Sequence, residues 1–562
     1  MKKINQLFLL TFILFGIFLT KVSASEVVAK IGNTTYETLD DAILAVEDDE
    51  TIELLQDTKL TKVTAIDKNI TINGNSHSIN ISSLPSDDGR LSLRATLTLN
   101  NTIIEHNNTT TNSNAWGLYL ASNAILNLND SYYTIQTHGV YASPKATINL
   151  NHSTMTAKDM NYTAFMQGDE SNNYAYLNLT NRAQLRIDNI TSTTGNGTNW
   201  FSISADNSEI FVTNCARQGF VGGRLELKNN STANYLNNQI AFTLYQYDYI
   251  RINEGTTLNV NNNSSVGIWQ YGGEIKVAKN ANLEMTQNGK QRAIDTTNYN
   301  GAVINSTNYY QNATITFEDG ANVAINDNYL RAIRNSGVAY IGSNTEIMNN
   351  GLVTEEGKMI PQYGGGVYND GMMTINSNVK LYNNHARLAG DDIYSRSTVT
   401  FSKVGEDWLL DDCNDKINGW YDDSLDNRWE AHDTNNIHVE LTDPNTYEGE
   451  LALKAAHDNI GKVIINYVDT DGNVLTDEII LTGEVGKNYL TEEKKFDGYV
   501  FVKVEGNKEG VFDFENTYVT YYYTKYTATG DVEVIPPKTG VGEESSKMPL
   551  QIKLDLSKKE DE

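Results

Sequence analysis

The stretches Ala124-Ile-Leu-Asn-Leu-Asn-Asp130 and Ala146-Thr-Ile-Asn-Leu-Asn-His152 share one pattern, in which apolar and polar residues alternate and a polar residue follows. Alternation makes one face of a short β-strand apolar. The polar residue after the strand, often Asn, tolerates the left-handed conformation that a tight corner requires. Each copy therefore predicts a strand that ends at a corner. Further copies occupy residues 175–181, 223–229, 257–261, 273–279, 313–319, 373–377 and 397–401.

Repetition of this unit along the chain predicts a solenoid. Coils of about twenty residues with inserted loops fit the unequal spacing of the copies. Stacked coils share one apolar core, and Asn side chains at equivalent corners are expected to hydrogen-bond in ladders along the axis. A β-sandwich instead needs hairpin turns at regular intervals, and the Asn-Gly and Asp-Gly dipeptides are too irregularly placed for that. The predicted fold class is all-β, with a right-handed single-stranded parallel β-helix over residues 61–445.

The ends of such a solenoid need covers, because an open coil exposes its core and its strand edges. Residues 25–60 predict an N-terminal α/β cap with the order strand, helix, strand. Thr38 and Asp41 form a capping-box-like helix start. The helix face that is expected to plug the first coil consists of Leu39, Ala42, Ile43 and Val46.

Large aromatic and acidic residues cluster after the last clear repeat. We favour a C-terminal cap in which the aromatic rings seal the core, and an exposed sugar or calcium site is the alternative. Residues 446–461 are predicted to be a linker. The cluster consists of Trp408, Trp420, Tyr421, Trp429, Asp411, Asp412, Asp422 and Asp423.

The first residues carry an export signal. Lys2 and Lys3 precede an apolar run, and small residues follow it, which is typical of a secretory signal peptide over residues 1–24. Cleavage is expected between Ala24 and Ser25, and an uncleaved anchoring helix is the alternative. We therefore expect a secreted protein at the cell surface or in the cell wall.

The net charge restricts the expected binding partners, and the cysteine content restricts disulfide bonding. The formal net charge is −28, and loss of residues 1–24, which hold three lysines and no acid, makes it −31. Such a charge repels phosphate backbones and other polyanions, so nucleic acid is not an expected partner. Cys215 and Cys413 are the only cysteines and provide no disulfide framework. We expect a monomer without cofactor or metal.

Residues 26 to about 440 resemble the pectin-lyase-like β-helices of Gram-positive surface adhesins. The resemblance rests on residues 32–42 and on the Gly-rich stretch 364–369 leading to Gly390-Asp391-Asp392-Ile393-Tyr394. It implies a scaffold that displays binding surfaces.

Because this fold also hosts polysaccharide lyases and polygalacturonases, an enzyme is the alternative. Such chemistry needs several carboxylates, or acids with a basic residue, around one sugar bond. Arg387, Asp391 and Asp392 are the candidates, but the companion motifs of polygalacturonases are absent from the sequence.

Residues 462–525 resemble a MucBP (mucin-binding protein) repeat. The Tyr-Val-Asp-x-x-Gly-Asn hairpin of residues 467–473, the stretch 481–489, Gly498-Tyr499 and the closing residues 519–523 carry the resemblance. It implies a small β-grasp-like domain found in surface proteins that contact mucins or other host glycans. The Asp469 turn also suggests a calcium loop, but it lacks the remaining ligand positions, so a plain turn is favoured.

A disordered tail is expected over residues 526–562. It contains Pro536-Pro537-Lys538-Thr539-Gly540, which is similar to the sortase Leu-Pro-x-Thr-Gly signal, with Pro536 in the Leu position. The residues after this motif lack the apolar span of a working signal, so covalent anchoring and release both stay open.

Taken together, these features predict a secreted or cell-surface adhesin that binds host glycans, mucin or a host surface protein. The β-helix is the scaffold, and no catalytic role is assigned. A polysaccharide-degrading enzyme is the first alternative, and a non-binding surface stalk is the second.

Overall fold

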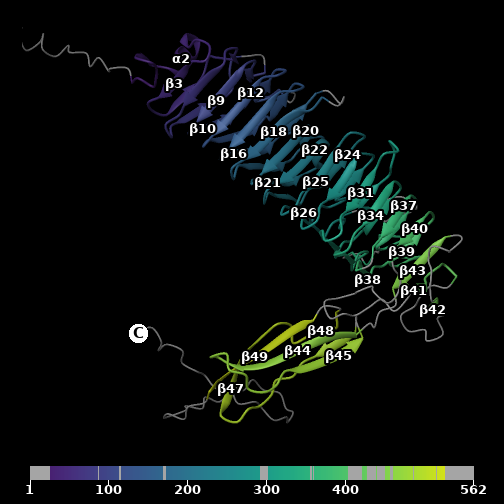
Figure 1. Cartoon of the computed structure of the whole chain (residues 1–562). Coiled ribbons are helices and arrows are strands. Elements are labelled where there is room, and N and C mark those ends of the chain that lie inside the picture. The colour runs from purple at the N-terminus through teal and green to yellow at the C-terminus, as the bar shows by residue number, and fades with distance from the viewer. Residues whose placement is uncertain are drawn as a thin grey trace, which may run out of the picture. The chain divides into compact units, whose positions relative to one another are not determined.

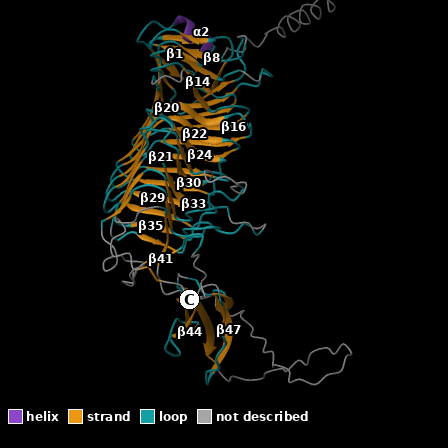
Figure 2. Cartoon of the chain, turned by 90° about the vertical axis from the view of Figure 1, so that its right-hand side faces the viewer, coloured by secondary structure: helices purple, strands orange, loops and turns teal. Residues whose placement is uncertain are grey.

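The computed structural model describes residues 26–85, 88–112, 115–168, 173–291, 301–354, 357, 360–376, 378–402, 420–426, 438–439, 450–455, 460–484, 487–513 and 516–525. The chain divides into two compact units, residues 1–457 and residues 458–562. In the larger unit, strands lie side by side in successive coils of a parallel β-solenoid (Figures 1 and 2). Among the described residues, no helix has both the length and the apolar character needed to cross a membrane.

The solenoid begins with the predicted strand, helix and strand. Strand β1 (Ala29–Ile31) pairs antiparallel with β2 (Thr34–Tyr36) and β3 (Thr51–Leu54), and α2 (Leu39–Ala45) connects the latter two. The Thr38 hydroxyl accepts the N–H of Asp41 at 3.0 Å, which caps the helix as predicted. Helix α2 lies at the start of the solenoid (Figure 1). Its predicted apolar face is buried through Leu39, Ala42, Ile43 and Val46.

Each coil contributes strands to three faces, which we call the first, second and third face in chain order. The strands of each face pair in parallel with those of the next coil. Strands β20 (Asn196–Asp206) and β22 (Gln218–Lys228) run unbroken from the third face into the first.

The first face consists of β3, β6 (Ile70–Asn73), β9 (Thr96–Asn100), β12 (Ile125–Asn129), β15 (Thr147–Asn151), β18 (Ala175–Thr180), β20, β22, β25 (Tyr249–Ile252), β28 (Glu274–Val277), β31 (Thr314–Phe317), β34 (Val338–Ile341), β37 (Met372–Ile375) and β40 (Val399–Phe401). The second face consists of β4 (Thr58–Leu60), β7 (Ser78–Ile81), β10 (Ile103–Asn107), β13 (Tyr132–Thr137), β16 (Thr154–Met160), β19 (Gln184–Ile190), β21 (Glu209–Cys215), β23 (Thr232–Leu236), β26 (Thr257–Asn261), β29 (Asn282–Thr286), β32 (Asn322–Asn326), β35 (Thr345–Met348) and β38 (Lys380–Tyr382). The third face consists of β5 (Ala65–Ile66), β8 (Leu91–Leu93), β11 (Leu118–Leu120), β14 (Val140–Ala142), β17 (Phe165–Gln167), the first halves of β20 and β22, β24 (Ile240–Leu244), β27 (Ile268–Gln270), β30 (Ala302–Ser306), β33 (Arg331–Asn335), β36 (Val367–Asn369) and β39 (Ile393–Ser395).

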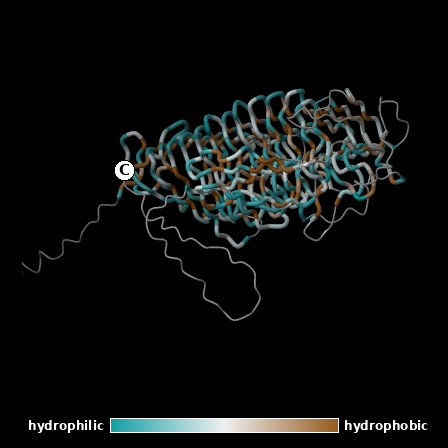
Figure 3. Tube along the Cα trace, turned by 90° about the horizontal axis from the view of Figure 1, so that it is seen from below, coloured by the Kyte–Doolittle hydropathy of each residue, from teal (hydrophilic) through white to brown (hydrophobic). Residues whose placement is uncertain are grey.

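The predicted repeats form strands of this solenoid. All except residues 257–261 stack in the first face, and those residues form β26 of the second face. Within the strands, alternate residues point into the core, as Leu126 and Leu128 do in β12. Hydrophobic and hydrophilic residues accordingly alternate along the coils (Figure 3). The alternation read from the sequence therefore gives the side-chain orientation correctly.

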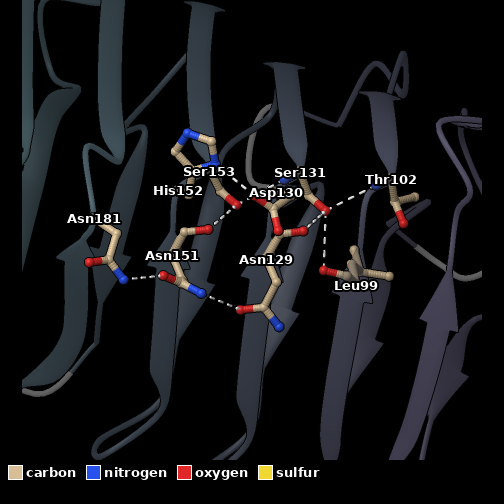
Figure 4. A network of polar contacts seen from close by, with 9 residues as sticks. All are labelled: Leu99, Thr102, Asn129, Asp130, Ser131, Asn151, His152, Ser153 and Asn181. Carbon is tan, nitrogen blue, oxygen red and sulfur yellow. Dashed lines mark hydrogen bonds and ion pairs between the residues drawn. The ribbon is translucent and has the colours of Figure 1, made fainter.

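The corner between the first and second faces has the predicted asparagine ladder. Asp130, His152 and Asn181 follow their strands with positive φ angles of 50°, 49° and 56°. The Asn151 amide donates to Asn129 Oδ1 at 3.2 Å, and Asn181 donates to Asn151 Oδ1 at 2.6 Å (Figure 4). These bonds tie the coils of β12, β15 and β18 to one another at the same position.

Antiparallel strands close the far end of the solenoid. Strand β43 (Leu451–Ala455) pairs with β39 and with β41 (Trp420–Asp422), and β41 pairs with β42 (His438–Val439). The prediction that residues 446–461 form only a linker is wrong for Leu451–Ala455, because their hydrogen-bonding groups complete the last coil. Of the predicted aromatic and acidic cap, residues 408, 411, 412 and 429 lie outside the described residues.

The smaller unit is a β-domain with a mixed four-stranded sheet. Its strand order is β45 (Ile479–Glu484), β44 (Ile460–Asp469), β49 (Thr517–Lys525), β47 (Tyr499–Glu505), with the central pair parallel and the outer pairs antiparallel. A separate two-stranded antiparallel sheet of β46 (Asn488–Leu490) and β48 (Glu509–Val511) completes it. One face of the sheet packs on a core of Val463, Ile465, Tyr467, Tyr489, Phe512, Val519, Tyr521 and Tyr523.

Candidate functional site

A buried asparagine ladder runs along the corner between the second and third faces. In each of several consecutive coils, an Asn side-chain oxygen accepts the backbone N–H of the Asn one coil earlier, at 3.0 to 3.4 Å. The amide groups also donate to backbone carbonyl groups of the preceding coil. The members are Asn238, Asn263, Asn288, Asn328, Asn350 and Asn384.

Asp392, a predicted enzyme candidate, terminates this ladder. Its Oδ1 accepts the backbone N–H of Asn384 at 3.0 Å and the Asn384 amide at 2.9 Å. Its Oδ2 accepts the N–H of Ala455 in β43 at 2.8 Å. Burial raises the pKa of Asp392 to about 7, opposed by Lys454 and by these N–H donors. The carboxylate thus joins the last ladder asparagine to the closing strand.

Asp391 supports the same junction. Its Oδ1 accepts the N–H of Ala386 at 2.9 Å, and its Oδ2 receives the Lys454 ammonium at 2.8 Å. Its own N–H donates to the Asp423 carboxylate at 2.6 Å. The N–H of Arg387 donates to the Pro361 carbonyl. Asp391 and Asp392 are both buried, and their named partners are structural groups of the protein itself.

We expect Asp392→Asn to lower the free energy of unfolding of the last coils by about 1–3 kcal/mol. An amide has one oxygen, so its NH₂ group must face either the Ala455 N–H or the two donors of Asn384. Hydrogen exchange of β39 and β43 measures the effect. Exposed Asp426→Asn is the control, and unchanged exchange in Asp392→Asn would contradict the role of Asp392 in closing the solenoid.

Several predicted sites lie outside the described residues. These are the cleavage residues Ala24 and Ser25 and the sorting-like residues Pro536, Pro537, Lys538, Thr539 and Gly540. Cys215 is a free, buried cysteine. Cys413, with which no disulfide is predicted, lies outside the described residues. Among the described residues, no group of three or more His, Cys, Asp or Glu side chains is placed to hold a metal ion.

The Asp469 turn of the small domain is a self-contained turn. Asp469 Oδ1 accepts the N–H groups of Asp471 at 3.0 Å and Asn473 at 2.8 Å. The Asn473 amide donates to both carboxylate oxygens. Gly472 has a φ of 86°, which a glycine adopts without strain. The carboxylate thus holds the turn together, as the turn interpretation of this motif expects.

The outer face of the small domain's sheet carries a row of apolar side chains. Ile480, Ile464 and Tyr518 are in register on the neighbouring strands β45, β44 and β49. Ile480 and Tyr518 are exposed, with Tyr518 at 59%. Beside this row, Tyr522 donates to Glu505 at 2.9 Å, and the Lys503 ammonium lies over the Tyr522 ring at 4.6 Å. An apolar row open to solvent marks a candidate contact surface.

The sequence analysis did not predict this row, although the row leaves a signal in the sequence. The segment Val463-Ile464-Ile465 is apolar on both faces of its strand, whereas a strand with one solvated face should alternate. Val463 and Ile465 are buried in the core, so Ile464 lies on the opposite face. The break in alternation is therefore the readable mark of this surface.

The solenoid has a hollow of about 680 Å³ on its second face. It extends over β26, β29, β32, β35 and β38, and the small side chain of Ala324 lies within it. Amide side chains around it pair along the axis, as Asn322 does with Asn282 at 3.0 Å. Charged groups are few, and Lys380 is paired with Glu346 at 2.7 Å.

The geometry of residues 460–525 defines a small β-domain with one packed and one open sheet face. Residues 462–524 match the family model of the MucBP domain, as predicted. Over 65 residues the chain is 42% identical to Internalin J of Listeria monocytogenes serovar 1/2a (strain ATCC BAA-679 / EGD-e). The matched stretch covers 12% of this chain and 8% of that protein. Internalin J of Listeria monocytogenes serotype 4b (strain F2365) is likewise 42% identical over 65 residues, 12% of this chain and 7% of that protein. The chain therefore spans less than a tenth of the length of these curated relatives.

Proposed function

We propose that this protein is an exported adhesin whose MucBP domain binds mucin or another host glycan. The observation that carries the proposal is the MucBP match over residues 462–524, on a domain whose sheet exposes an apolar row. The strong negative charge argues for neutral or weakly charged glycans over polyanions. The solenoid serves as the scaffold, because parallel strand pairing joins its successive coils and antiparallel strands close its far end.

The contact surface of the MucBP domain is the row of Ile480, Ile464 and Tyr518. Tyrosine offers a large flat apolar area with a polar tip, which suits the mixed faces of a sugar chain. The side chain of Tyr518 is exposed, so the fold does not depend on its burial. Loss of this ring should therefore affect binding more than stability.

We expect Tyr518→Ser to weaken binding of the mature chain to immobilised mucin about tenfold, with an unchanged melting temperature. Surface plasmon resonance and a thermal melt measure the two quantities. Val474→Ser, at an exposed position in the hairpin of the same domain, is the matched control. Equal affinities of Tyr518→Ser and the unaltered chain would show that this face is not the contact surface.

Binding without turnover separates the adhesin from the enzyme alternative. After incubation with the glycans that bind, assays for new reducing ends and for unsaturated ends should stay at the level of the protein-free control. New chain ends that disappear in Asp392→Asn would overturn the adhesin proposal in favour of a polysaccharide-degrading enzyme. Absence of any glycan or mucin binding would instead favour a stalk.

A further inference from the structure

Six aromatic side chains gather at the corner between the third and first faces, in the middle coils of the solenoid. Trp200 lies 5.1 Å from Tyr245 between ring centroids, and Tyr245 lies 5.6 Å from Tyr271, with interplanar angles of 26° and 9°. Trp269 stacks on Tyr271 at 5.7 Å. Tyr309 and Tyr310 meet these rings edge-on at 6.5 and 6.4 Å. We call these six residues the aromatic corner.

The aromatic corner lies at the surface. Tyr309 is 73% exposed, Tyr310 is exposed, and the other four rings are half-buried. The rings come from the coils of β20, β24, β27 and β30, so they follow one another along the solenoid axis. A surface built in this way presents a line of apolar contacts and not a single pocket.

Trp200 occupies its place in a strained conformation. Its φ is 59°, in the left-handed region that bulky side chains avoid. Its ring lies over Gly222 of the next coil, where a Cβ would come within 2.5 Å of the indole. Gly222 thus leaves the space through which Trp200 reaches Tyr245, two coils away. Because the ring is only half-buried, core packing does not explain this strained arrangement, and such strain is concentrated at functional sites.

Buried polar groups hold the aromatic corner in place. The Asp248 carboxylate accepts the N–H of Tyr245 at 2.7 Å, the N–H of Gly223 at 2.8 Å and the Tyr174 hydroxyl at 2.9 Å. In the loop that follows β30, the Asn312 amide donates to the Gln246 carbonyl at 2.6 Å. The corner is therefore a preorganised surface.

The segments that carry the rings are nearly free of charge. Residues 199–200, 245–248, 269–273 and 307–312 contain a single charged residue, the buried Asp248, although a fifth of the whole chain is charged. They are rich in amides, including Gln246, Asn308 and Gln311. Sugar rings stack their C–H faces on aromatic rings, while their hydroxyl groups bond to amides at the rim.

We propose that the aromatic corner is a second binding site, which takes a neutral glycan chain along the solenoid axis. The stacked rings receive the apolar sugar faces, and the rim amides of residues 246, 308 and 311 bind hydroxyl groups. Apart from the buried Asp248, these segments carry no charge, and within a strongly acidic protein this selects against sulfated and uronic-acid polymers. This site belongs to the solenoid and is independent of the proposed role of the MucBP domain.

Substitution Trp200→Asn tests the proposal, because Asn adopts the left-handed conformation readily while removing the ring. Maltohexaose, cellohexaose and chitohexaose are titrated into the full mature chain, with heparin as the polyanion, and binding is followed by calorimetry and tryptophan fluorescence. We expect at least one neutral oligomer to bind and heparin not to bind. Trp200→Asn and Tyr309→Ala should each raise the dissociation constant about tenfold or more, and Trp200→Asn should keep or raise the melting temperature. Tyr132→Ala, an exposed tyrosine on the second face, is the matched control and should bind normally.

The outcomes are distinguishable. Absence of binding by any neutral oligomer up to about 10 mM, or unchanged binding in Trp200→Asn, would overturn the proposal. A lower melting temperature in Trp200→Asn with unaltered binding would assign the ring a structural role. A dimer of the unaltered chain that dissociates in Trp200→Asn, measured by analytical ultracentrifugation, would make a second copy the occupant and overturn the glycan assignment. Oligosaccharide binding that persists in Tyr518→Ser would support the corner even if mucin binding by the MucBP domain fails.

Discussion

Replacement of Asn328 by alanine is expected to lower the free energy of unfolding of the solenoid by about 3–5 kcal/mol. The Asn328 amide donates to the carbonyl groups of Met285 and Asn326, each at 2.9 Å, and its Oδ1 accepts the N–H of Asn288 at 3.0 Å. These groups are buried, and alanine leaves the Met285 carbonyl and the Asn288 N–H without these partners. Each unsatisfied buried group costs about 1–3 kcal/mol, and the cavity adds to this.

The measurement is urea unfolding followed by far-ultraviolet circular dichroism. Because each coil contacts only its neighbours, hydrogen exchange should rise first in the coils next to Asn328. Asn322→Ala is the matched control, since Asn322 lies in β32 of the same coil but is exposed. Its expected effect is within about 0.5 kcal/mol. Similar effects of the two substitutions would refute a dominant role of the buried ladder in stability.

Acidification is expected to destabilise the N-terminal coils through His106. This histidine is buried in β10, and its Nδ1 lies 2.9 Å from the Tyr133 hydroxyl. Burial lowers the pKa of His106 from 6.5 to about 3. The stability that this neutral imidazole contributes is therefore complete above pH 6.5 and is lost as the pH falls toward 3. At pH 4.5 the loss amounts to about 3 kcal/mol.

The double variant His106→Leu/Tyr133→Phe removes both the imidazole and the hydroxyl that pairs with it. We expect its stability relative to the unaltered chain to rise by about 3 kcal/mol between pH 7 and pH 4.5. Hydrogen exchange of β10 and β13 at the two pH values measures the change. His77→Gln, at a partly exposed histidine of a neighbouring coil, is the control for loss of a histidine side chain. A parallel pH dependence in the double variant and the unaltered chain would exclude His106 as its source.

The sequence predicted the first face of the solenoid well, because alternation and a polar corner residue are local properties. Residues 124–130 and 146–152 form β12 and β15 with the expected corners at Asp130 and His152. The N-terminal helix was equally readable, since its cap and its apolar face lie within eight residues of each other. The MucBP domain was recognised through spaced turn and strand residues.

The candidate sites were less readable, as Asp391 and Asp392 show. In the sequence these two residues form an acidic pair with Arg387 nearby, a combination that is compatible with cleavage of a sugar polymer. Their partners Lys454 and Ala455 lie 63 residues further along the chain. Only pairing of β43 with β39 brings these groups together. The predicted linker concealed that strand, because a short closing strand has no repeat to identify it.

The sequence by itself determined the class of fold, the faces of its strands and the identity of the small domain. Tertiary structure alone decided which asparagines form the buried ladder and which residues form the aromatic corner. The ladder members Asn263 and Asn288 are 25 residues apart, but Asn288 and Asn328 are 40 apart. Inserted loops change the length of each coil without changing its rise, so a fixed sequence period is absent. Stacking restores the register, because backbone hydrogen bonds between coils tolerate no shift that would turn the apolar face outward.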